Sequence, residues 1–441
     1  MVFKGSQYFF SLLSSFNVLK FFSILILLSI CWFSVDSDVS TFRIFLIIYV
    51  TSIVFYLPRN ILSPVNILML YYGLWFFLAP LLGSGYTSYL LESYGYKYSF
   101  ALVSINYIFS LYSLILGGMF FSKVRLNVSV SLLSPKIIKR NIFLLYIFST
   151  MMIFFIINVS GGFGVWLKDP GDAFLNRGGS GVYVILSHFS IYALGALIGL
   201  YCYNFNKKTP VFLFVIWLFV CSPIIGSKFQ IILFMLIPFL PWLKNIRTLS
   251  IYTVLIGCAF IFIFILGMLF RGFSGDFENL LMLFNYFSTL HNLAISVSDF
   301  SPGSISTFLL PFNKFITPFG IENGVSYYDM NHLLTDIYYP KAWEIRATEQ
   351  WPVETDLYLN FYFFGGLPLI FIYMFFLGAI HALSLKSSSL GLSVVAFIFS
   401  VSMISHLRGS LYNHTDFYMI PFLCFILFVF YNVRLKSGKE I

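Results

Sequence analysis

Twelve blocks of mainly apolar residues run along the chain, separated by polar stretches. They cover residues 19–34, 44–58, 61–82, 99–121, 141–159, 181–204, 210–225, 229–243, 249–270, 357–383, 390–405 and 417–433. A helix that crosses a bilayer needs about 20 mostly apolar residues, and helices satisfy their own backbone hydrogen bonds in lipid. The pattern therefore predicts an all-α, polytopic transmembrane helix bundle of about 12 spans. We expect a single membrane domain over residues 1–441.

The adjacent blocks 210–225 and 229–243 need a separate argument. Read as one helix, residues 210–243 would extend about 51 Å at 1.5 Å per residue, which is too long for one crossing. Basic residues precede and follow the pair. Two short crossings, or a re-entrant pair, fit the length better, with a turn at Gly226-Ser227-Lys228.

The composition excludes the main soluble classes. Hydrophobic residues make up 59% of the 441 residues and charged residues only 10%, whereas a soluble domain is typically about 25% charged. A transmembrane β-barrel requires alternating polarity rather than long apolar blocks. The five cysteines show no CxxC spacing, so they indicate neither a disulfide framework nor a zinc site. No P-loop or dinucleotide motif is present, and we expect no cofactor and no metal.

The formal net charge of +9 is explained by topology rather than by a nucleic-acid partner. With twelve spans, the loops on one side of the membrane hold 16 basic residues and one acid, Glu440. The loops on the other side hold 10 basic residues and 16 acids. Since cytoplasmic loops carry the excess of Lys and Arg, the first set is expected inside the cell. Both termini are then cytoplasmic.

Two loops of the acidic, external side stand out. The larger one covers residues 271–355 and holds most of the external acids. It is expected to be partly helical, because residues 277–284 show helical spacing of apolar side chains. The smaller loop, 160–181, contains two Gly-rich clusters, which suit either a flexible connector or close backbone approach to a ligand. Loops this long are uncommon unless they are functional.

Four cations lie at the external ends of spans, each beside Gly or Ser: Arg177, Lys228, Arg271 and Arg408. Each by itself is compatible with ordinary loop charge. Together they favour a shared anion site, because Arg binds phosphate and carboxylate oxygens in pairs. The natural anion at a membrane boundary is a lipid phosphate or pyrophosphate.

The end of the larger loop carries a second group of polar residues. Glu354, Asp356, Tyr358 and Asn360 lie at the mouth of the span that follows. On a helix, residues 354 and 358 share a face, as do 356 and 360. A helix N-terminus favours acids through its dipole, which accounts for the two carboxylates but not for Tyr358 and Asn360.

These residues resemble a known family. The pattern PxExDxYxNF…GG at the end of the loop, the Arg in the Gly-rich loop and the Gly-Ser-Lys turn are similar to those of Wzy-type O-antigen or capsular polysaccharide polymerases. The family joins undecaprenyl-pyrophosphate-linked oligosaccharide repeat units at the periplasmic face of the bacterial inner membrane. Its members often carry Gly-Ser-Arg at the turn, where this chain has Lys228. A flippase and a chain-length regulator of the same pathway are the partners that the resemblance implies.

The resemblance assigns a role to each candidate residue. The acceptor hydroxyl attacks the anomeric carbon through an oxocarbenium-like transition state, as in glycoside hydrolysis. We expect Arg177, Lys228, Arg271 and Arg408 to bind the departing pyrophosphate. Glu354 or Asp356 is the first choice of catalytic base, with His332 or His414 next. Tyr358 and Asn360 are expected to bind sugar hydroxyls.

Three alternatives remain open at the level of sequence. An O-antigen ligase would use the same donor with a lipid A–core acceptor. A metal-dependent glycosyltransferase using polyprenyl-linked sugars would need paired carboxylates, and both Asp36-Ser37-Asp38 and Glu354-Thr355-Asp356 have that spacing. A lipid-linked oligosaccharide flippase or another transporter would place charges near the bilayer midplane and often shows inverted repeats.

Overall fold

The computed structural model describes residues 38–82, 96–124, 130–175, 179–225, 228–269, 287, 289–316, 327–344 and 348–435. Every named element within them is a helix, which confirms the all-helical class. The longer apolar elements are α3 (Asp38–Tyr56), α4 (Pro64–Tyr72) continued by η1 (Gly73–Leu78) and α5 (Ala79–Leu82), α7 (Tyr96–Phe121), α8 (Pro135–Val159), α11 (Gly181–Phe205), α12 (Thr209–Ile225), α13 (Lys228–Leu236) continued by η2 (Ile237–Phe239) and α14 (Leu240–Leu243), α15 (Ile251–Leu269), α21 (Leu367–Lys386), α22 (Leu390–Leu407) and α23 (Asp416–Phe430).

Short helices occupy the two predicted external loops. They are α9 (Phe163–Lys168), α10 (Pro170–Leu175), α16 (Thr289–Asp299), α17 (Leu310–Ile316), α18 (Met330–Tyr338), α19 (Pro340–Glu344) and α20 (Val353–Phe361), with η5 (Phe364–Gly366) before α21. The larger loop is therefore partly helical, as expected. The predicted helix at 277–284 lies outside the described residues.

Within the described residues, six helices are long and apolar enough to cross a membrane. They are Pro64–Leu82, Tyr98–Phe121, Pro135–Val159, Gly181–Phe205, Phe364–Lys386 and Leu390–Leu407. Shorter apolar helices include Thr41–Tyr56, Thr209–Ile225, Gln230–Leu243 and Asp416–Phe430. By helix length and composition the chain is a membrane protein. The block at 19–34 lies outside the described residues, and the number of twelve spans and the cytoplasmic termini stay predictions.

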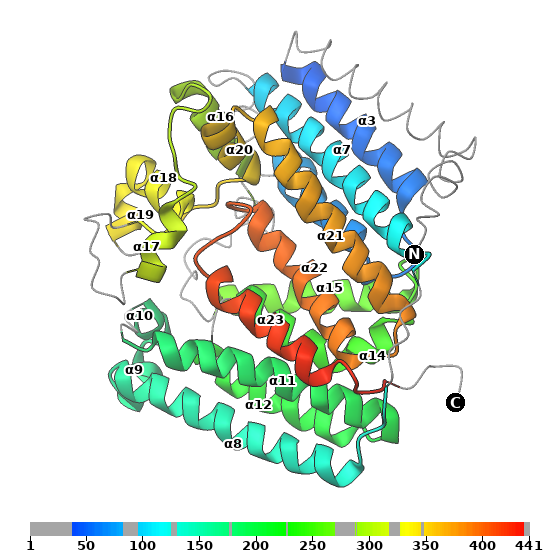
Figure 1. Ribbon diagram of the computed structural model, residues 1–441. Coiled ribbons are helices and arrows are strands. Elements are labelled where there is room, and N and C mark those ends of the chain that lie inside the picture. Colours follow the sequence, from blue (N-terminus) through cyan, green and yellow to red (C-terminus); the bar gives the residue numbers. More distant parts are fainter. Residues whose placement is uncertain are drawn as a thin grey trace.

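The helices pack around two apolar cores. One core unites α3, α4, α7 and α21 with α16 and α20, and the other unites α8, α11, α12 and α23. In Figure 1 the first group fills the upper part of the molecule and the second group the lower part. Residues of α22 belong to both: Val394 and Ile398 to the second core, Met403 and Leu407 to the first.

Two glycines set the closest helix crossing of the first core. A Cβ atom at Gly117 of α7 would lie 2.0 Å from the carbonyl oxygen of Phe375, and one at Gly378 of α21 would lie 2.2 Å from that of Leu114. Small residues at such crossings let two backbones approach each other, which is the common way of packing helices in membranes. The absence of side chains at these two positions therefore fixes how α7 lies against α21.

The predicted break between the blocks 210–225 and 229–243 is confirmed. Helix α12 ends at Ile225 and α13 begins at Lys228. The predicted span 357–383 is confirmed only in part: Phe364–Lys386 is long and apolar enough to cross a membrane, but residues 357–361 belong to the separate helix α20. Tyr362 takes a left-handed backbone conformation with φ of 53° and ends α20, and Phe363 after it also has a positive φ, of 63°. Pro368 in the first turn of α21 suits a new helix start.

The short helices gather at one end of the long ones. Figure 1 shows α9, α10 and α17 to α19 at the left end of the bundle, with α16 and α20 above them at the ends of α7 and α21. The described parts of the loops 160–181 and 271–355 therefore lie at the same end of the helices, as the alternation of charge requires. Glu354 and His332, the candidate residues of the larger loop that the structure describes, belong to helices at this end.

Candidate functional site

Helix α20 carries the polar residues at the end of the larger loop. The segment before it is fixed on both sides: the indole nitrogen of Trp75 donates to the side chain of Gln350 (3.1 Å), and Asn292 donates to the Gln350 carbonyl oxygen (2.7 Å). Pro352 then precedes the first turn, in which Glu354 and Asp356 lie. Both carboxylates are buried, with 0% and 3% of their residues exposed. Buried acids need partners, and each has its own set.

Glu354 points toward the transmembrane helices. One of its oxygens, Oε1, accepts hydrogen bonds from the hydroxyl of Tyr72 on α4 (2.7 Å) and the amide of Asn106 on α7 (2.9 Å). Asn106 also donates to the Tyr72 hydroxyl at 3.0 Å. The other oxygen, Oε2, is buried and has no hydrogen-bond partner among the described residues. Burial raises the pKa of Glu354, and the hydrogen bonds from Asn106 and Tyr72 act in the opposite direction.

This burial makes stability depend on pH. Because the folded-state pKa is raised, the folded protein keeps a proton that the unfolded chain releases above the ordinary glutamate range of about 4.3. The free energy of unfolding therefore falls as the pH rises through this window. We expect Glu354→Gln to flatten the fall of the melting temperature of detergent-purified protein between about pH 5 and pH 8. Parallel curves for the variant and the wild type would contradict this.

Asp356 points to the opposite side of α20. Its Oδ1 accepts a hydrogen bond from Asn360 Nδ2 at 2.7 Å, and it is also bonded by Ser410, Thr307 and the backbone N–H of Leu411. The predicted pairing of 356 with 360 on one face is confirmed by this contact. Burial raises the pKa of Asp356, and these hydrogen bonds counteract the rise.

Asp356 also lies on the wall of a cavity of about 550 Å³, called the Asp356 cavity below. The other polar members of the wall are Tyr373 and Tyr412. The remaining side chains are apolar: Phe308, Phe361, Leu369, Ile372, Phe376, Ile380, Phe399 and Leu411. From Tyr373 to Ile380 the cavity follows α21 for seven residues, roughly 10 Å of helix. Ile372 and Phe376 are more than half exposed at its side. The cavity thus has a carboxylate in a wall that is otherwise mostly apolar and follows a membrane helix.

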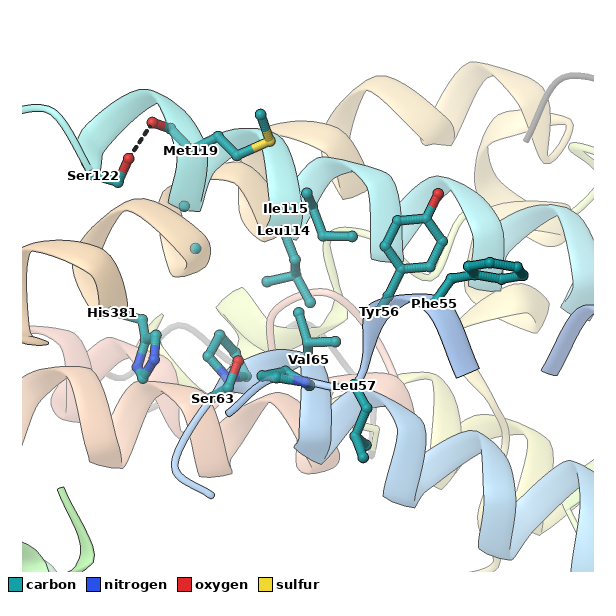
Figure 2. A pocket seen from close by; sticks show the side chains of 14 residues that line it. Phe55, Tyr56, Leu57, Ser63, Val65, Leu114, Ile115, Met119, Ser122 and His381 are labelled. Carbon is teal, nitrogen blue, oxygen red and sulfur yellow. Dashed lines mark hydrogen bonds between the residues drawn. The ribbon is translucent and has the colours of Figure 1, made fainter. Parts of the chain in front are cut away.

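A second cavity, of about 410 Å³, lies between α3, α4, α7 and α21. Figure 2 shows its wall, with Phe55 and Tyr56 from α3, Leu114 and Ile115 from α7, and His381 from α21. Ser122 follows the last turn of α7, so this cavity lies toward the helix ends away from α20. It contains no carboxylate, and none of the predicted site residues contributes to it.

One predicted pyrophosphate-binding cation has a described side chain. Arg408 caps the end of α22 and is half-buried. Its guanidinium lies 5.6 Å from the centre of the Trp75 ring, and its Nε is buried without a hydrogen-bond partner among the described residues. Arg177 and Arg271 lie outside the described residues, as does the side chain of Lys228. The shared anion site therefore stays a prediction.

His332 belongs to a cluster on α18. Asp329 caps this helix by accepting from the His332 backbone N–H at 2.9 Å, and its other oxygen lies 3.3 Å from Nδ1 of His414. The two imidazole rings are 5.9 Å apart. Burial raises the pKa of Asp329, but the hydrogen bond from His414 and the nearby His332 outweigh this, so the net pKa lies below the usual value. Asn331 donates to the Arg408 carbonyl oxygen at 3.2 Å, which places the cluster beside the Arg408 segment.

Tyr358 and Asn360 form hydrogen bonds inside the protein. The Tyr358 hydroxyl donates to the carbonyl oxygen of Phe300 at 2.9 Å. Asn360 accepts from the backbone N–H of Thr307 at 2.6 Å and donates to the Thr307 hydroxyl at 2.7 Å, in addition to its bond with Asp356. These contacts hold the segment after α16 against α20. The binding of sugar hydroxyls by Tyr358 and Asn360 stays a prediction.

Glu354 and Asp356 do not converge on one point. Two residues apart on a helix, their side chains project about 200° apart, and their partners come from different helices. Among the described residues, no group of three or more His, Cys, Asp and Glu side chains has a geometry suited to a metal ion. This arrangement does not favour joint metal binding by the two carboxylates.

Sequence reasoning missed Tyr72 and Asn106 as partners of Glu354. Asn106 gives a usable signal, because it is an amide within the apolar run 99–121, and polar residues inside membrane helices are functional candidates. Tyr72 gives no such signal, since tyrosine is frequent throughout this chain.

Comparison with known proteins identifies no relative: no family model, curated protein or solved structure matches the chain.

Proposed function

We propose that the protein is a membrane glycosyltransferase that polymerises lipid-linked oligosaccharide repeat units. The donor is an undecaprenyl-pyrophosphate-linked glycan, and transfer takes place at the periplasmic face of a bacterial inner membrane. The acceptor hydroxyl forms a bond to the anomeric carbon as the bond to the lipid pyrophosphate breaks. The pyrophosphate leaves with the bonding electron pair and remains on its lipid.

The observation that carries the proposal is the position of Asp356. A buried carboxylate lies on the wall of a cavity whose aromatic and apolar side chains continue along a membrane helix. A polyprenyl chain suits the apolar part, and aromatic side chains such as Phe308 and Tyr412 suit sugar rings near the carboxylate. The negative charge of Asp356 stabilises the positive charge that develops on the sugar in the transition state.

The cationic side chains are assigned to binding of the leaving group. Arg408 lies two residues before Ser410, which bonds Asp356, and its guanidinium is not taken up by an ion pair among those described. We assign Arg408, together with Arg177, Lys228 and Arg271, to the departing pyrophosphate. In a partly dehydrated site such charges act more strongly than in water.

Gel electrophoresis of the surface polysaccharide from a deletion strain tests this function. A polymerase deletion should leave lipopolysaccharide or capsule with a single repeat unit in place of the ladder of lengths, because transfer to the final acceptor is intact. Reintroducing the gene should restore the ladder. Loss of every repeat unit from lipid A–core would contradict the proposal and indicate a ligase or a flippase.

A further inference from the structure

Three polar side chains lie in a row between α21, α22 and α23. The two oxygens of Asp416 lie 3.1 Å and 3.0 Å from Nε2 of His406, and Nδ1 of His406 lies 2.7 Å from the hydroxyl oxygen of Tyr373. His406 is 4% exposed. The backbone N–H of Asn413 donates to Asp416 at 2.7 Å and fixes the carboxylate. None of the three was a predicted site residue.

The row has a defined direction of hydrogen bonding. An ionised carboxylate only accepts hydrogen bonds, so Nε2 of a neutral His406 carries the ring proton and donates it to Asp416. Nδ1 is then the acceptor and receives the hydrogen bond of the Tyr373 hydroxyl. The Tyr373 oxygen therefore keeps its lone pairs available for a further donor.

Tyr373 is on the wall of the Asp356 cavity. The row therefore runs from Asp416 and His406, which do not line the cavity, to Tyr373, whose side chain lines it. Asp356 lies on the same wall, but four donors bond it: Asn360, Ser410, Thr307 and the Leu411 N–H. A carboxylate has about four lone-pair positions. Asp356 can supply negative charge, but its oxygens are occupied, and it is poorly placed to take a proton.

We propose that Asp416, His406 and Tyr373 form a proton relay that takes the proton of the attacking sugar hydroxyl in the Asp356 cavity. This assignment rests on the proposed function and names the base of that reaction. It replaces Glu354 and Asp356 in that role. Glu354 is excluded from it because it does not line the cavity and bonds Tyr72 and Asn106 on the other side of α20.

The relay balances in atoms and charge. As the acceptor oxygen bonds to the anomeric carbon, its proton passes to the Tyr373 oxygen, and the Tyr373 proton passes to Nδ1 of His406. The imidazolium that forms is stabilised by Asp416. His406 returns its proton through Tyr373 to water when the products leave. No oxidant, reductant or co-reactant beyond the donor and the acceptor is required.

The test uses the full-length protein in nanodiscs, supplied with lipid-linked repeat unit extracted from the deletion strain. We expect Tyr373→Phe and His406→Gln each to lower kcat about 100-fold while KM changes little. The double variant should lose no more than the stronger single variant, since residues acting as one unit are not additive. The solvent deuterium isotope effect on kcat should change in the variants, which a purely structural role would not produce.

Tyr338→Phe is the matched control. The Tyr338 hydroxyl donates to Asp299 at 2.8 Å at an exposed position outside the cavity, so its loss should leave kcat unchanged. Melting temperatures identify variants that merely fold poorly, and Asp416→Glu should retain part of the activity that Asp416→Ala loses. If folded Tyr373→Phe keeps more than half of kcat, the relay is wrong. If the wild-type protein forms no polymer from this substrate, the proposed function itself fails.

Discussion

Asp356→Asn is expected to lower the rate of polymer formation by about 1,000-fold, because it removes the negative charge from the reacting end of the Asp356 cavity. In other enzymes, a single preorganised group that stabilises transition-state charge raises the rate about 100- to 1,000-fold. Because Asp356 supplies a full negative charge, we expect its loss to lower the rate by about 1,000-fold, at the upper end of this range. The rate is measured with purified protein and the lipid-linked repeat unit. In cells, the polysaccharide ladder should collapse to a single repeat unit.

In this variant, an effect on protein stability has to be distinguished from an effect on the reaction rate. The side chain of Asp356 receives hydrogen bonds from four donors, and an asparagine amide would turn its own donors toward some of them. Unmatched buried donors cost about 1–3 kcal/mol, so the variant's melting temperature must be measured alongside its rate. Asp299→Asn, which alters an exposed acid of the larger loop, is the control for loss of a carboxylate. A folded Asp356→Asn protein with nearly normal activity would remove Asp356 from the reaction.

The largest effect on stability is expected at the crossing of α7 and α21. A methyl group at Gly378 would lie 2.2 Å from the Leu114 carbonyl oxygen and 3.0 Å from the Gly118 nitrogen. Both atoms belong to backbone and cannot turn away. Overpacking of this kind costs about 1–3 kcal/mol, so Gly378→Ala should lower the melting temperature in detergent clearly, and Gly378→Leu should prevent folding.

The neighbouring glycine of α7 offers a control within the same crossing. A methyl group at Gly118 would find its nearest atom at 3.8 Å, an ordinary contact. Gly118→Ala should therefore melt close to the wild type, whereas Gly117→Ala, whose added atom would lie 2.0 Å from the Phe375 oxygen, should behave like Gly378→Ala. Equal melting temperatures for Gly118→Ala and Gly378→Ala would contradict this account of the crossing.

The sequence predicted the helices better than their ends. Long apolar runs identify helices because hydrophobicity acts over whole segments, and the break at Gly226–Lys228 followed from length alone. The split at Tyr362 and Phe363 was missed because both residues are hydrophobic and rarely adopt a positive φ. The hydrogen bond that closes the end of α20, from the Phe363 N–H to the Leu357 carbonyl oxygen, cannot be recognised from the pattern of hydrophobic residues.

The site was predictable only where its members are close in the chain. Asp356 and Asn360 are one helical turn apart, so their contact followed from spacing. Tyr72 and Glu354 are 282 residues apart, and Tyr373 and His406 are 33 apart on different helices. Such contacts depend on how the helices pack. Periodicity within a single segment carries no information about that packing.

Helix α22 has a mechanical consequence for the relay. Its first half is packed in one apolar core and its second half in the other, so any rocking of the two helix groups against each other is transmitted along this one helix. His406 lies in its last turn, and the neighbouring Tyr373 and Asp416 belong to helices on either side. A tilt of α22 that brings His406 closer to Tyr373 takes it away from Asp416, and the reverse. The spacing within the relay is thus coupled to the relative position of the two halves of the protein.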